Sequence, residues 1–515
     1  MRSDEARKVR IPGMRASPPA WLTAAGLSVG ALAMIPVAYL VARSFESGDE
    51  AWETLLRPRT AQLVVNSLVL AVSVGVTSLL LGTVSGWMLA HVRLRGRVLW
   101  GVIVTLPLAV PSYLAAYGWL VLIPSLSGFW PSWVVLTMAG TPYVTLAVAA
   151  ALRSSSGHLE PVARSLGRSP LSAFFSVTWP RVAPSALAGT LVAVLYSLSD
   201  FGAVSMLRFQ TLTWGIHSAY AASFDRGLAA VLSVVLVLLA ATVVITERRL
   251  RRRVPPALGN TRPPSLALGP RMLPLVVIAS IPPLLGVLLP LAGLLDRLLQ
   301  AETMRQIDVE RFFAATASTI TLGAAAAALT VLLSLPVAAL AARYSGPLVS
   351  LVESSTSVAL ALPGIVVGLS LVFFTLTVAP AFYQGLAALV FAYAVLFLPR
   401  AVGTVRSGLA LVPIRLAEVS HSLGVSVVRS WMRITLPMAL PSLGVAACLV
   451  AIAAAKELPA TLLLRPTGTS TLATELWSRT AVAEFGAAAP YAAMLVLVAA
   501  VPAVLLSRAA GKDAT

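Results

Sequence analysis

The chain has 515 residues, of which 58% are hydrophobic and only 11% are charged, and its mean hydropathy is +0.88. Soluble domains average about 45–50% apolar and about 25% charged residues, so this composition excludes a water-soluble globular protein and favours a lipid bilayer as the solvent. The formal net charge is +18. The single cysteine, Cys448, excludes an internal disulfide framework, and the four scattered histidines offer no metal-binding spacing.

Twelve long, predominantly apolar runs are the predicted membrane-spanning helices. A helix needs about 20 apolar residues to cross a hydrocarbon core of roughly 30 Å, and only helices or closed barrels satisfy the backbone in lipid. In chain order the runs cover 20–43, 62–91, 98–122, 132–152, 184–204, 227–246, 272–295, 316–342, 349–378, 384–399, 441–463 and 486–507. The first run is long enough to remain as an uncleaved anchor. The sequence therefore predicts an all-α integral membrane protein with about 12 transmembrane helices.

The basic residues predict the orientation of these helices, because Lys and Arg are retained on the cytoplasmic side during insertion. If both termini are cytoplasmic, 27 of the 38 basic residues fall in the termini and the cytoplasmic loops, but only six of the 20 acidic residues do. This bias accounts for the high net charge, so we expect no nucleic-acid partner. Membrane lipid is the expected surrounding.

The chain contains an internal repeat. At an offset of 257 positions, Ser165-Leu-Gly aligns with Ser422-Leu-Gly, and Asp200 aligns with Glu457. Earlier in each half the register slips, and Asn66-Ser fall opposite Ala317-Ser at an offset of 251. Two parallel six-helix halves imply a pathway between them. The predicted segments are a cytoplasmic basic tail (1–19), a first half (20–246), a Pro- and Gly-rich cytoplasmic linker (247–271), a second half (272–507) and a cytoplasmic tail (508–515).

Each half has a long cytoplasmic loop between its fourth and fifth spans, and the two loops share one spacing. In the first loop Gly167 is followed after 13 residues by Pro180, and in the second Gly424 is followed after 13 residues by Pro437. A glutamate suits the start of a helix, and a glycine suits a left-handed stop. Each loop therefore predicts a short helix, a turn at glycine and a second amphipathic helix that enters the membrane.

This duplicated pattern resembles the EAA loop in the membrane subunits of binding-protein-dependent ABC importers. The chain departs from the family pattern in the first loop, where Glu160 lies seven residues before Gly167 and Pro161 stands where the family glutamate is expected. The resemblance implies an ABC importer type I permease-like fold and a role in ATPase coupling for Glu160, Ala163, Gly167, Pro180, Glu418, Gly424 and Pro437.

The segments that follow the two loops, 199–208 and 456–474, are similar to the ferric-iron branch of these permeases, which commonly fuses two halves in one chain. The resemblance implies import of ferric iron through the bacterial inner membrane, with thiamine, a polyamine or an oxyanion as alternative cargo. It also implies two copies of an ABC ATPase subunit and a periplasmic solute-binding protein as partners.

The chain lacks the G-x-x-x-x-G-K-[ST] motif that binds nucleotide phosphates, because Gly511-Lys512 is followed by Asp513 without the upstream glycine. We therefore expect no enzymatic activity and no bound cofactor in this chain, with ATP and Mg used by the partner subunit. Two interpretations of other classes stay open: a secondary carrier driven by protons or sodium, and a membrane scaffold that does not transport.

Asp200 and Glu457 are the candidate residues of the translocation path. A carboxylate at membrane depth must face protein or water, and oxygen ligands suit a hard cation such as ferric iron. The alternative is a structural ion pair with Lys456, Arg208 or Arg465, or an interfacial carboxylate. No metal site is firmly assigned.

Three further features of the spans allow two interpretations each. Glu353 near the start of the ninth span is expected to reach the cytoplasmic interface rather than to relay protons. The prolines in 106–111 and in 362–364 predict breaks in the third span of each half, which can line a pathway or serve packing alone.

Overall fold

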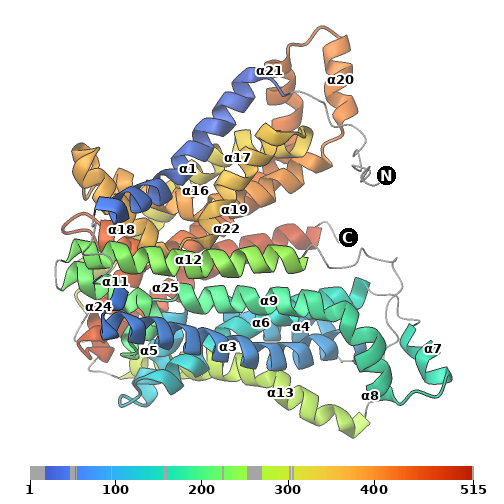
Figure 1. Cartoon of the computed structure of the whole chain (residues 1–515), viewed down its shortest axis with the longest axis vertical. Coiled ribbons are helices and arrows are strands. Elements are labelled where there is room, and N and C mark those ends of the chain that lie inside the picture. Colours follow the sequence, from blue (N-terminus) through green and yellow to red (C-terminus); the bar gives the residue numbers. More distant parts are fainter. Residues whose placement is uncertain are drawn as a thin grey trace.

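The protein is described by a computed structural model for residues 18–46, 53, 55–93, 96–154, 159–222, 225–251, 269–300, 303 and 307–512. These residues form helices and no β-strand (Figure 1). Ten of the described helices are long and apolar enough to cross a membrane, and two bent helix pairs raise the number to 12 if each pair is one span. The predicted all-α membrane fold is confirmed.

The first half is built from 11 described α-helices. They are α1 (Ala20–Glu46), α3 (Pro58–His91), α4 (Arg97–Thr105), α5 (Ser112–Leu122), α6 (Phe129–Ser154), α7 (Leu159–Ser165), α8 (Pro170–Ala173), α9 (Trp179–Ser199), α10 (Gly202–Met206), α11 (Leu212–Ala221) and α12 (Arg226–Arg251). Helix α12 continues to Arg251, so the first five residues of the predicted linker are helical. Linker residues 252–268, tail residues 1–17 and tail residues 513–515 lie outside the described residues.

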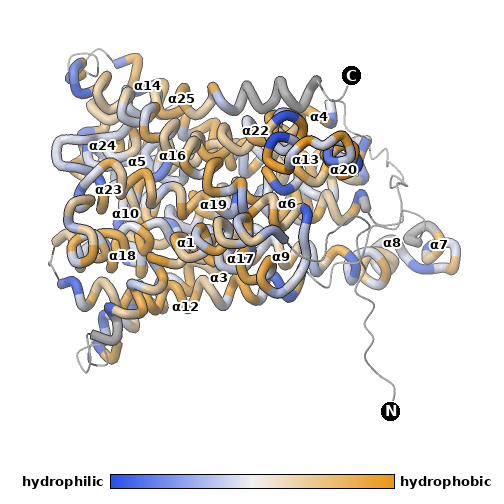
Figure 2. The backbone as a smooth tube through the Cα atoms, turned by 90° about the horizontal axis from the view of Figure 1, so that it is seen from above, coloured by the Kyte–Doolittle hydropathy of each residue, from blue (hydrophilic) through white to orange (hydrophobic). Residues whose placement is uncertain are grey.

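The second half repeats this order of elements. Its α-helices are α13 (Leu273–Pro283), α14 (Leu289–Leu299), α16 (Val309–Arg343), α17 (Pro347–Val358), α18 (Gly364–Thr377), α19 (Leu386–Leu411), α20 (Ile414–Ser422), α21 (Val427–Ser430), α22 (Leu436–Ala455), α23 (Pro459–Leu464), α24 (Leu472–Ala481) and α25 (Phe485–Lys512). A π-helical segment, η4 (Leu284–Leu288), joins α13 to α14, so together they form one span. Hydrophobic residues dominate along the long helices in both halves (Figure 2).

Matching hydrogen bonds within each half show which positions of the two halves are equivalent. In the first half the Ser67 hydroxyl accepts a bond from the Leu212 backbone N–H at 2.8 Å, and in the second half the Thr319 hydroxyl accepts one from Leu472 N–H at 2.9 Å. Ser67 and Thr319 are therefore equivalent, at an offset of 252. The predicted offset of 251, which paired Ser67 with Ser318, is wrong by one residue, because it followed the serine identity rather than the buried face of the helix.

The third span of each half is broken, as its prolines predict. Helices α4 and α5 meet at 86° and helices α17 and α18 meet at 108°, each across a short break. The residue before a proline is forced out of the helical region, and Leu362 before Pro363 is accordingly extended. Pro363 and its counterpart Pro111 then stand directly before the next helix.

The fifth span of each half is shorter than predicted. The runs 184–204 and 441–463 predict continuous helices, but α9 ends at Ser199 and α22 ends at Ala455. The chain is extended at Asp200 before the short helix α10 begins. Apolar composition continues across both breaks, so hydropathy alone does not reveal them.

The first span of each half packs against the other half. Helix α1 lies against α16, α17 and α18, whereas α13 and α14 lie against α3, α4, α5 and α6 (Figure 1). Helices α5 and α14 approach each other closely where Gly118 faces the backbone of Pro290. Each half therefore packs its first span against the other half. The short helices α7 and α20 project from one end of the body (Figure 1).

Candidate functional site

The helix α7 ends in a glycine turn, as the first loop predicts. Gly167 N–H donates to Arg164 O at 3.0 Å, and Arg168 N–H donates to Ala163 O at 3.2 Å. This pair of bonds is the Schellman arrangement, and it needs the left-handed backbone that Gly167 adopts with φ +87°. Ala163 is buried beneath the turn. The side chain of Glu160 lies outside the described residues.

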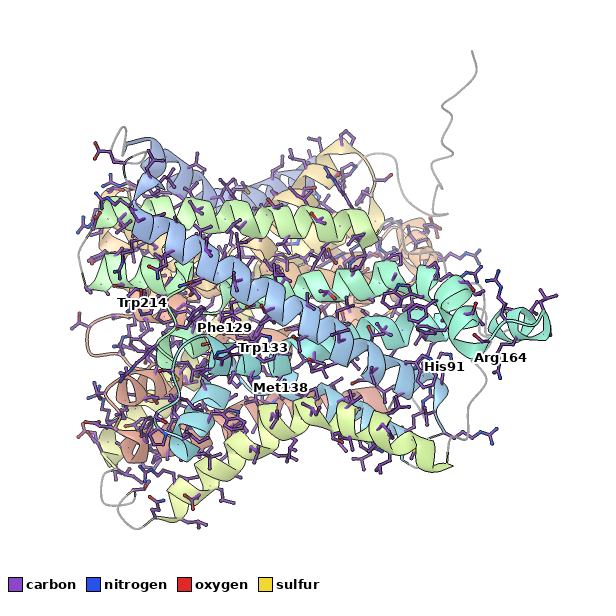
Figure 3. All side chains as sticks on the ribbon, turned by 60° about the horizontal axis from the view of Figure 1, so that its bottom comes forward. His91, Phe129, Trp133, Met138, Arg164 and Trp214 are labelled. Atoms are coloured by element: carbon purple, nitrogen blue, oxygen red, sulfur yellow. The ribbon has the colours of Figure 1, made fainter. Side chains whose placement is uncertain are left out.

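The helix α20 ends in the same way. Gly424 N–H donates to His421 O at 3.0 Å, Val425 N–H donates to Ser420 O at 3.1 Å, and Gly424 has φ +78°. Glu418 on this helix is exposed to solvent. We call α7 and α20, each with its glycine turn, the coupling helices, after the role that the resemblance implies for them. Figure 3 shows Arg164 of α7 beyond one end of the helical body, opposite the end that holds Trp214.

Each coupling helix leads through a π-helical segment into the fifth span. These segments are η2 (Phe174–Thr178) and η7 (Trp431–Thr435), and they are followed by Pro180 and Pro437 at the second position of α9 and of α22. Proline has no N–H to donate, and its ring clashes with the carbonyl four residues before it. A wider turn directly ahead relieves that clash, so the proline fixes how the loop enters the span.

Apolar side chains without cover mark the outer surface of both coupling helices. Leu166 is 80% exposed and Leu423 is 77% exposed, at equivalent positions directly before the two glycines. Val162 and Val419 lie one turn earlier and are also exposed. Paired apolar patches of this kind, rimmed by charges, are typical of a protein–protein interface.

Asp200 caps a helix at the break of the fifth span. Its Oδ1 accepts from the N–H groups of Ala203 at 3.0 Å and Val204 at 3.3 Å, and its Oδ2 accepts from the Ser112 hydroxyl. Asp200 is buried, and its backbone carbonyl accepts from Thr213 Oγ1 at 2.6 Å. Its bonds therefore tie the start of α10 to the start of α5.

Glu457 occupies the equivalent place in the second half. Its Oε1 accepts from Ala460 N–H at 3.1 Å at the start of α23. A Cβ added at Gly364 would stand 2.4 Å from the same oxygen. Thr461 Oγ1 donates to its backbone carbonyl at 2.7 Å. The breaks of the third and fifth spans therefore meet in both halves.

The structural ion pair that the sequence leaves open as an alternative for these two carboxylates is not found in the described part of the chain. None of the ion pairs found among the described residues involves Asp200 or Glu457. Lys456 instead donates from Nζ to Ala109 O, and Tyr113 OH donates to Lys456 O at 3.2 Å. These bonds join the breaks of the two halves to each other.

Substitutions at Asp200 separate capping from charge. We expect Asp200→Asn to keep the thermal stability of the purified chain, because an amide oxygen still accepts the two backbone bonds. Asp200→Ala loses the cap and should cost about 1–2 kcal/mol. Thermal unfolding in detergent measures both, with Ser112→Ala as a control that removes only the hydroxyl. Equal stability of Asp200→Ala and the wild type would contradict the capping role.

The sequence interpretation missed a second buried carboxylate and gave an incomplete account of Glu353. Glu475 is 1% exposed and accepts from Arg311 at 2.8 Å and from Arg479 at 3.3 Å. The spacing of Glu475 and Arg479, four residues apart on one helix, was the available signal. Glu353 forms an ion pair with Arg406 of α19. The sequence interpretation did not name this partner.

A cavity of about 470 Å³ lies between the halves. Helices α11 and α24, which carry part of its lining, lie at the end opposite the coupling helices (Figure 1). Phe201 and His217 of the first half and Trp477 of the second half line the cavity, and Trp477 Nε1 donates to Ser205 Oγ at 2.8 Å. Burial lowers the pKa of His217 to about 4, so this side chain is neutral near pH 7. Arg208 supplies a positive charge to the same cavity.

The described residues offer no ready-made metal site. No group of three or more His, Cys, Asp or Glu side chains gathers closely enough to hold an ion in the part of the chain that the structure covers. The arrangement thus combines a cavity at one end, broken helices in the middle and exposed apolar helices at the other end. It suits passage between two halves driven from outside the chain.

Comparison with known proteins agrees with this organisation. The family model described as the binding-protein-dependent transport system inner membrane component matches residues 78–255 and again residues 334–508. The Fe(3+)-transport system permease protein FbpB 2 of Haemophilus influenzae is 33% identical over 503 residues, which cover 96% of this chain and 99% of that protein.

Other relatives match over shorter stretches of the chain. The putrescine transport system permease protein PotI of Escherichia coli is 29% identical over 186 residues, which cover 32% of this chain and 66% of that protein. The sulfate transport system permease protein CysT of Escherichia coli is 25% identical over 195 residues, which cover 35% of this chain and 70% of that protein. The predicted duplication is confirmed.

Proposed function

Because the chain belongs to the family of binding-protein-dependent transport system inner membrane components, we propose that it is the fused permease of an ATP-driven ferric-iron importer. Members of this family are transport subunits of the inner membrane, so the chain is a multi-pass permease subunit rather than an enzyme. The observation that carries the proposal is the pair of coupling helices. Two matched helices with exposed apolar patches are what two identical partner subunits require.

We place one ATPase subunit on each coupling helix, with ATP and Mg bound by those subunits. In this proposal both termini and the coupling helices are cytoplasmic, and the cavity of Phe201, His217 and Trp477 faces the periplasmic binding protein. Closure and separation of the ATPases would bias the two halves between an outward-facing and an inward-facing arrangement. Asp200 and Glu457 would act on the path by holding the broken helix ends in register.

Ferric iron is the proposed cargo because the iron permease of Haemophilus influenzae is similar over nearly the whole chain, whereas the putrescine and sulfate permeases are similar over about a third of it. The polyamine and oxyanion relatives supply the alternative cargo.

Uptake of radiolabelled ferric iron tests the proposal. Cells that carry this chain together with its binding protein and ATPase should accumulate iron, and cells that lack only this chain should fall to background. Parallel assays with labelled putrescine and sulfate distinguish the alternatives. Iron accumulation that persists without the ATPase would indicate a secondary carrier instead.

A coupling-patch variant tests the docking of the ATPase. We expect Leu423→Glu to weaken binding of the ATPase to the purified chain by about tenfold or more, because a charge then faces an apolar contact. Leu411→Glu is the matched control, because Leu411 is about as exposed as Leu423 but lies outside the patch. Co-purification measures both, and equal binding by both variants would argue against the patch.

A further inference from the structure

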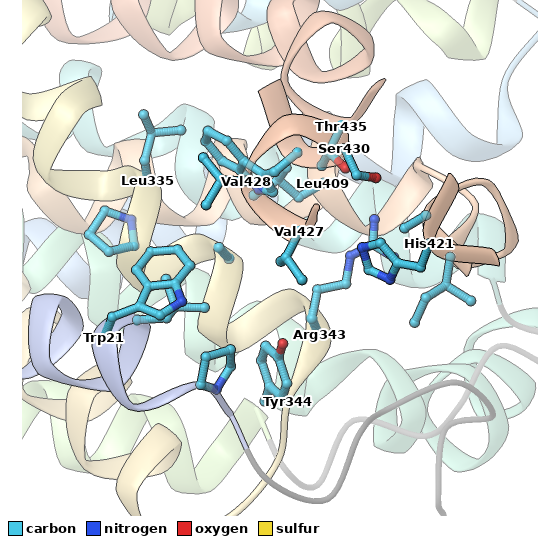
Figure 4. Close-up of a pocket in the computed structure, with 17 residues that line it drawn as sticks. Trp21, Leu335, Arg343, Tyr344, Leu409, His421, Val427, Val428, Ser430 and Thr435 are labelled. Atoms are coloured by element: carbon cyan, nitrogen blue, oxygen red, sulfur yellow. The ribbon is translucent and has the colours of Figure 1, made fainter. Parts of the chain in front are cut away.

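A groove lies directly beneath the second coupling helix. It has a volume of about 250 Å³ and is formed by the beginning of α1, the ends of α16 and α19, the helices α20 and α21, and η7. Figure 4 shows two different ends: His421 and Arg343 lie at one, and Trp21 and Leu335 lie at the other. The groove is therefore amphipathic along its length.

The first half fills the equivalent position. At the offset of 252 established by Ser67 and Thr319, Ala339 of the groove wall corresponds to Trp87. The Trp87 indole packs against two hydrophobic clusters and stacks on His91, with ring centroids 5.3 Å apart. The chain thus carries a bulky plug at this position in one half and a small alanine in the other. The small Ala339 leaves this position open in the second half.

Two buried polar atoms in the groove have no protein partner. Among the described residues, neither His421 Nε2 nor Ser430 Oγ has a hydrogen-bond partner, and Ser430 is only 2% exposed. An unpaired buried polar group costs about 1–3 kcal/mol, so these atoms call for a ligand that bonds to them. One water takes up about 30 Å³ and would leave most of the groove empty. Arg343, which donates to Val412 O at 3.0 Å, adds positive charge beside them.

We propose that an anionic glycerophospholipid of the inner leaflet occupies this groove. Its phosphate would accept from Ser430 and His421 beside Arg343, and an acyl chain would run toward Trp21. The apolar wall continues onto exposed apolar surface, because Leu332, one turn before Leu335 on α16, is 62% exposed and Trp21 is 59% exposed. Basic pockets between spans on the cytoplasmic side suit anionic headgroups, and Trp is typical of the interface. The bound lipid would connect α20 to α1 and α16.

Native mass spectrometry of the purified chain with added dioleoylphosphatidylglycerol or dioleoylphosphatidylcholine tests this proposal. We expect the wild type to retain phosphatidylglycerol about tenfold more tightly than phosphatidylcholine. Ala339→Trp, which copies the plug of the first half, should lose that retention. Leu332→Trp adds the same indole outside the groove and should retain the lipid as the wild type does.

A second variant makes the test independent of the plug. His421→Phe combined with Ser430→Ala keeps the volume but removes both polar partners, so the preference for phosphatidylglycerol over phosphatidylcholine should fall by about tenfold. Retention of phosphatidylglycerol by Ala339→Trp at the wild-type level would overturn the proposal. So would an unchanged preference in the double variant, or equal retention of the two lipids by the wild type.

Discussion

Gly118→Ala is expected to cause the largest loss of stability among the single substitutions considered for this chain. A Cβ at Gly118 would stand 2.4 Å from both Cα and O of Pro290, and backbone atoms cannot turn aside as a flexible side chain can. Gly293 makes the reciprocal contact, since its Cβ would stand 2.7 Å from Gly118 O. Helices in membranes approach this closely only through small residues. Separating α5 from α14 by even one methyl group therefore pushes the two halves apart.

The expected cost is about 2–3 kcal/mol, at the upper end of overpacking substitutions. Thermal unfolding of the detergent-purified chain should show a midpoint lower by about 2–3 °C, because the entropy of unfolding of a chain this long makes 1 kcal/mol worth about 1 °C. Gly403→Ala is the matched control, because Gly403 lies within α19 with nothing within 4 Å of the added Cβ. That variant should be neutral or slightly more stable, since alanine favours the helix. If Gly118→Ala unfolds at the wild-type temperature, the contact between α5 and α14 is not as close as described.

The coupling helices show what the sequence can predict. Their turns depend on local chemistry, because only glycine readily adopts the left-handed backbone found at Gly167 and Gly424, and the following proline fixes the entry into the next span. The broken third spans follow in the same way from Pro111 and Pro363. Each of these features is determined by a few neighbouring residues, so one sequence is enough to find it.

Features that depend on distant contacts escaped prediction. In a chain that is 58% hydrophobic, nothing in the apolar pattern distinguishes a face that packs on its own half from one that packs on the other, so the exchange of α1 and α13 was invisible. The sequence marks Asp200 as a candidate residue of the translocation path but does not reveal its partners, which are backbone N–H groups three and four residues ahead and a hydroxyl 88 residues away. Such a cap becomes apparent only once the helix break is known.

Loss of coupling is the expected result when both turn glycines become valine. Gly167 and Gly424 have φ values of +87° and +78°, and a left-handed backbone costs an L-residue about 1–2 kcal/mol, more when it is β-branched. Valine would therefore unwind the Schellman turns and turn α7 and α20 away from the ATPase. Nothing lies within 4 Å of a Cβ at either glycine, so the membrane body should remain folded.

We expect Gly167→Val with Gly424→Val to reduce uptake of radiolabelled iron at least tenfold, while the amount of chain in the membrane and its unfolding midpoint stay near those of the wild type. The double asparagine variant is the matched control, because asparagine tolerates the left-handed region and should keep most of the uptake. A chain that responded only to added bulk would lose uptake with both pairs of substitutions. Wild-type uptake by the valine pair would mean that the exposed helices transmit nothing, since the geometry that aims them would then be dispensable.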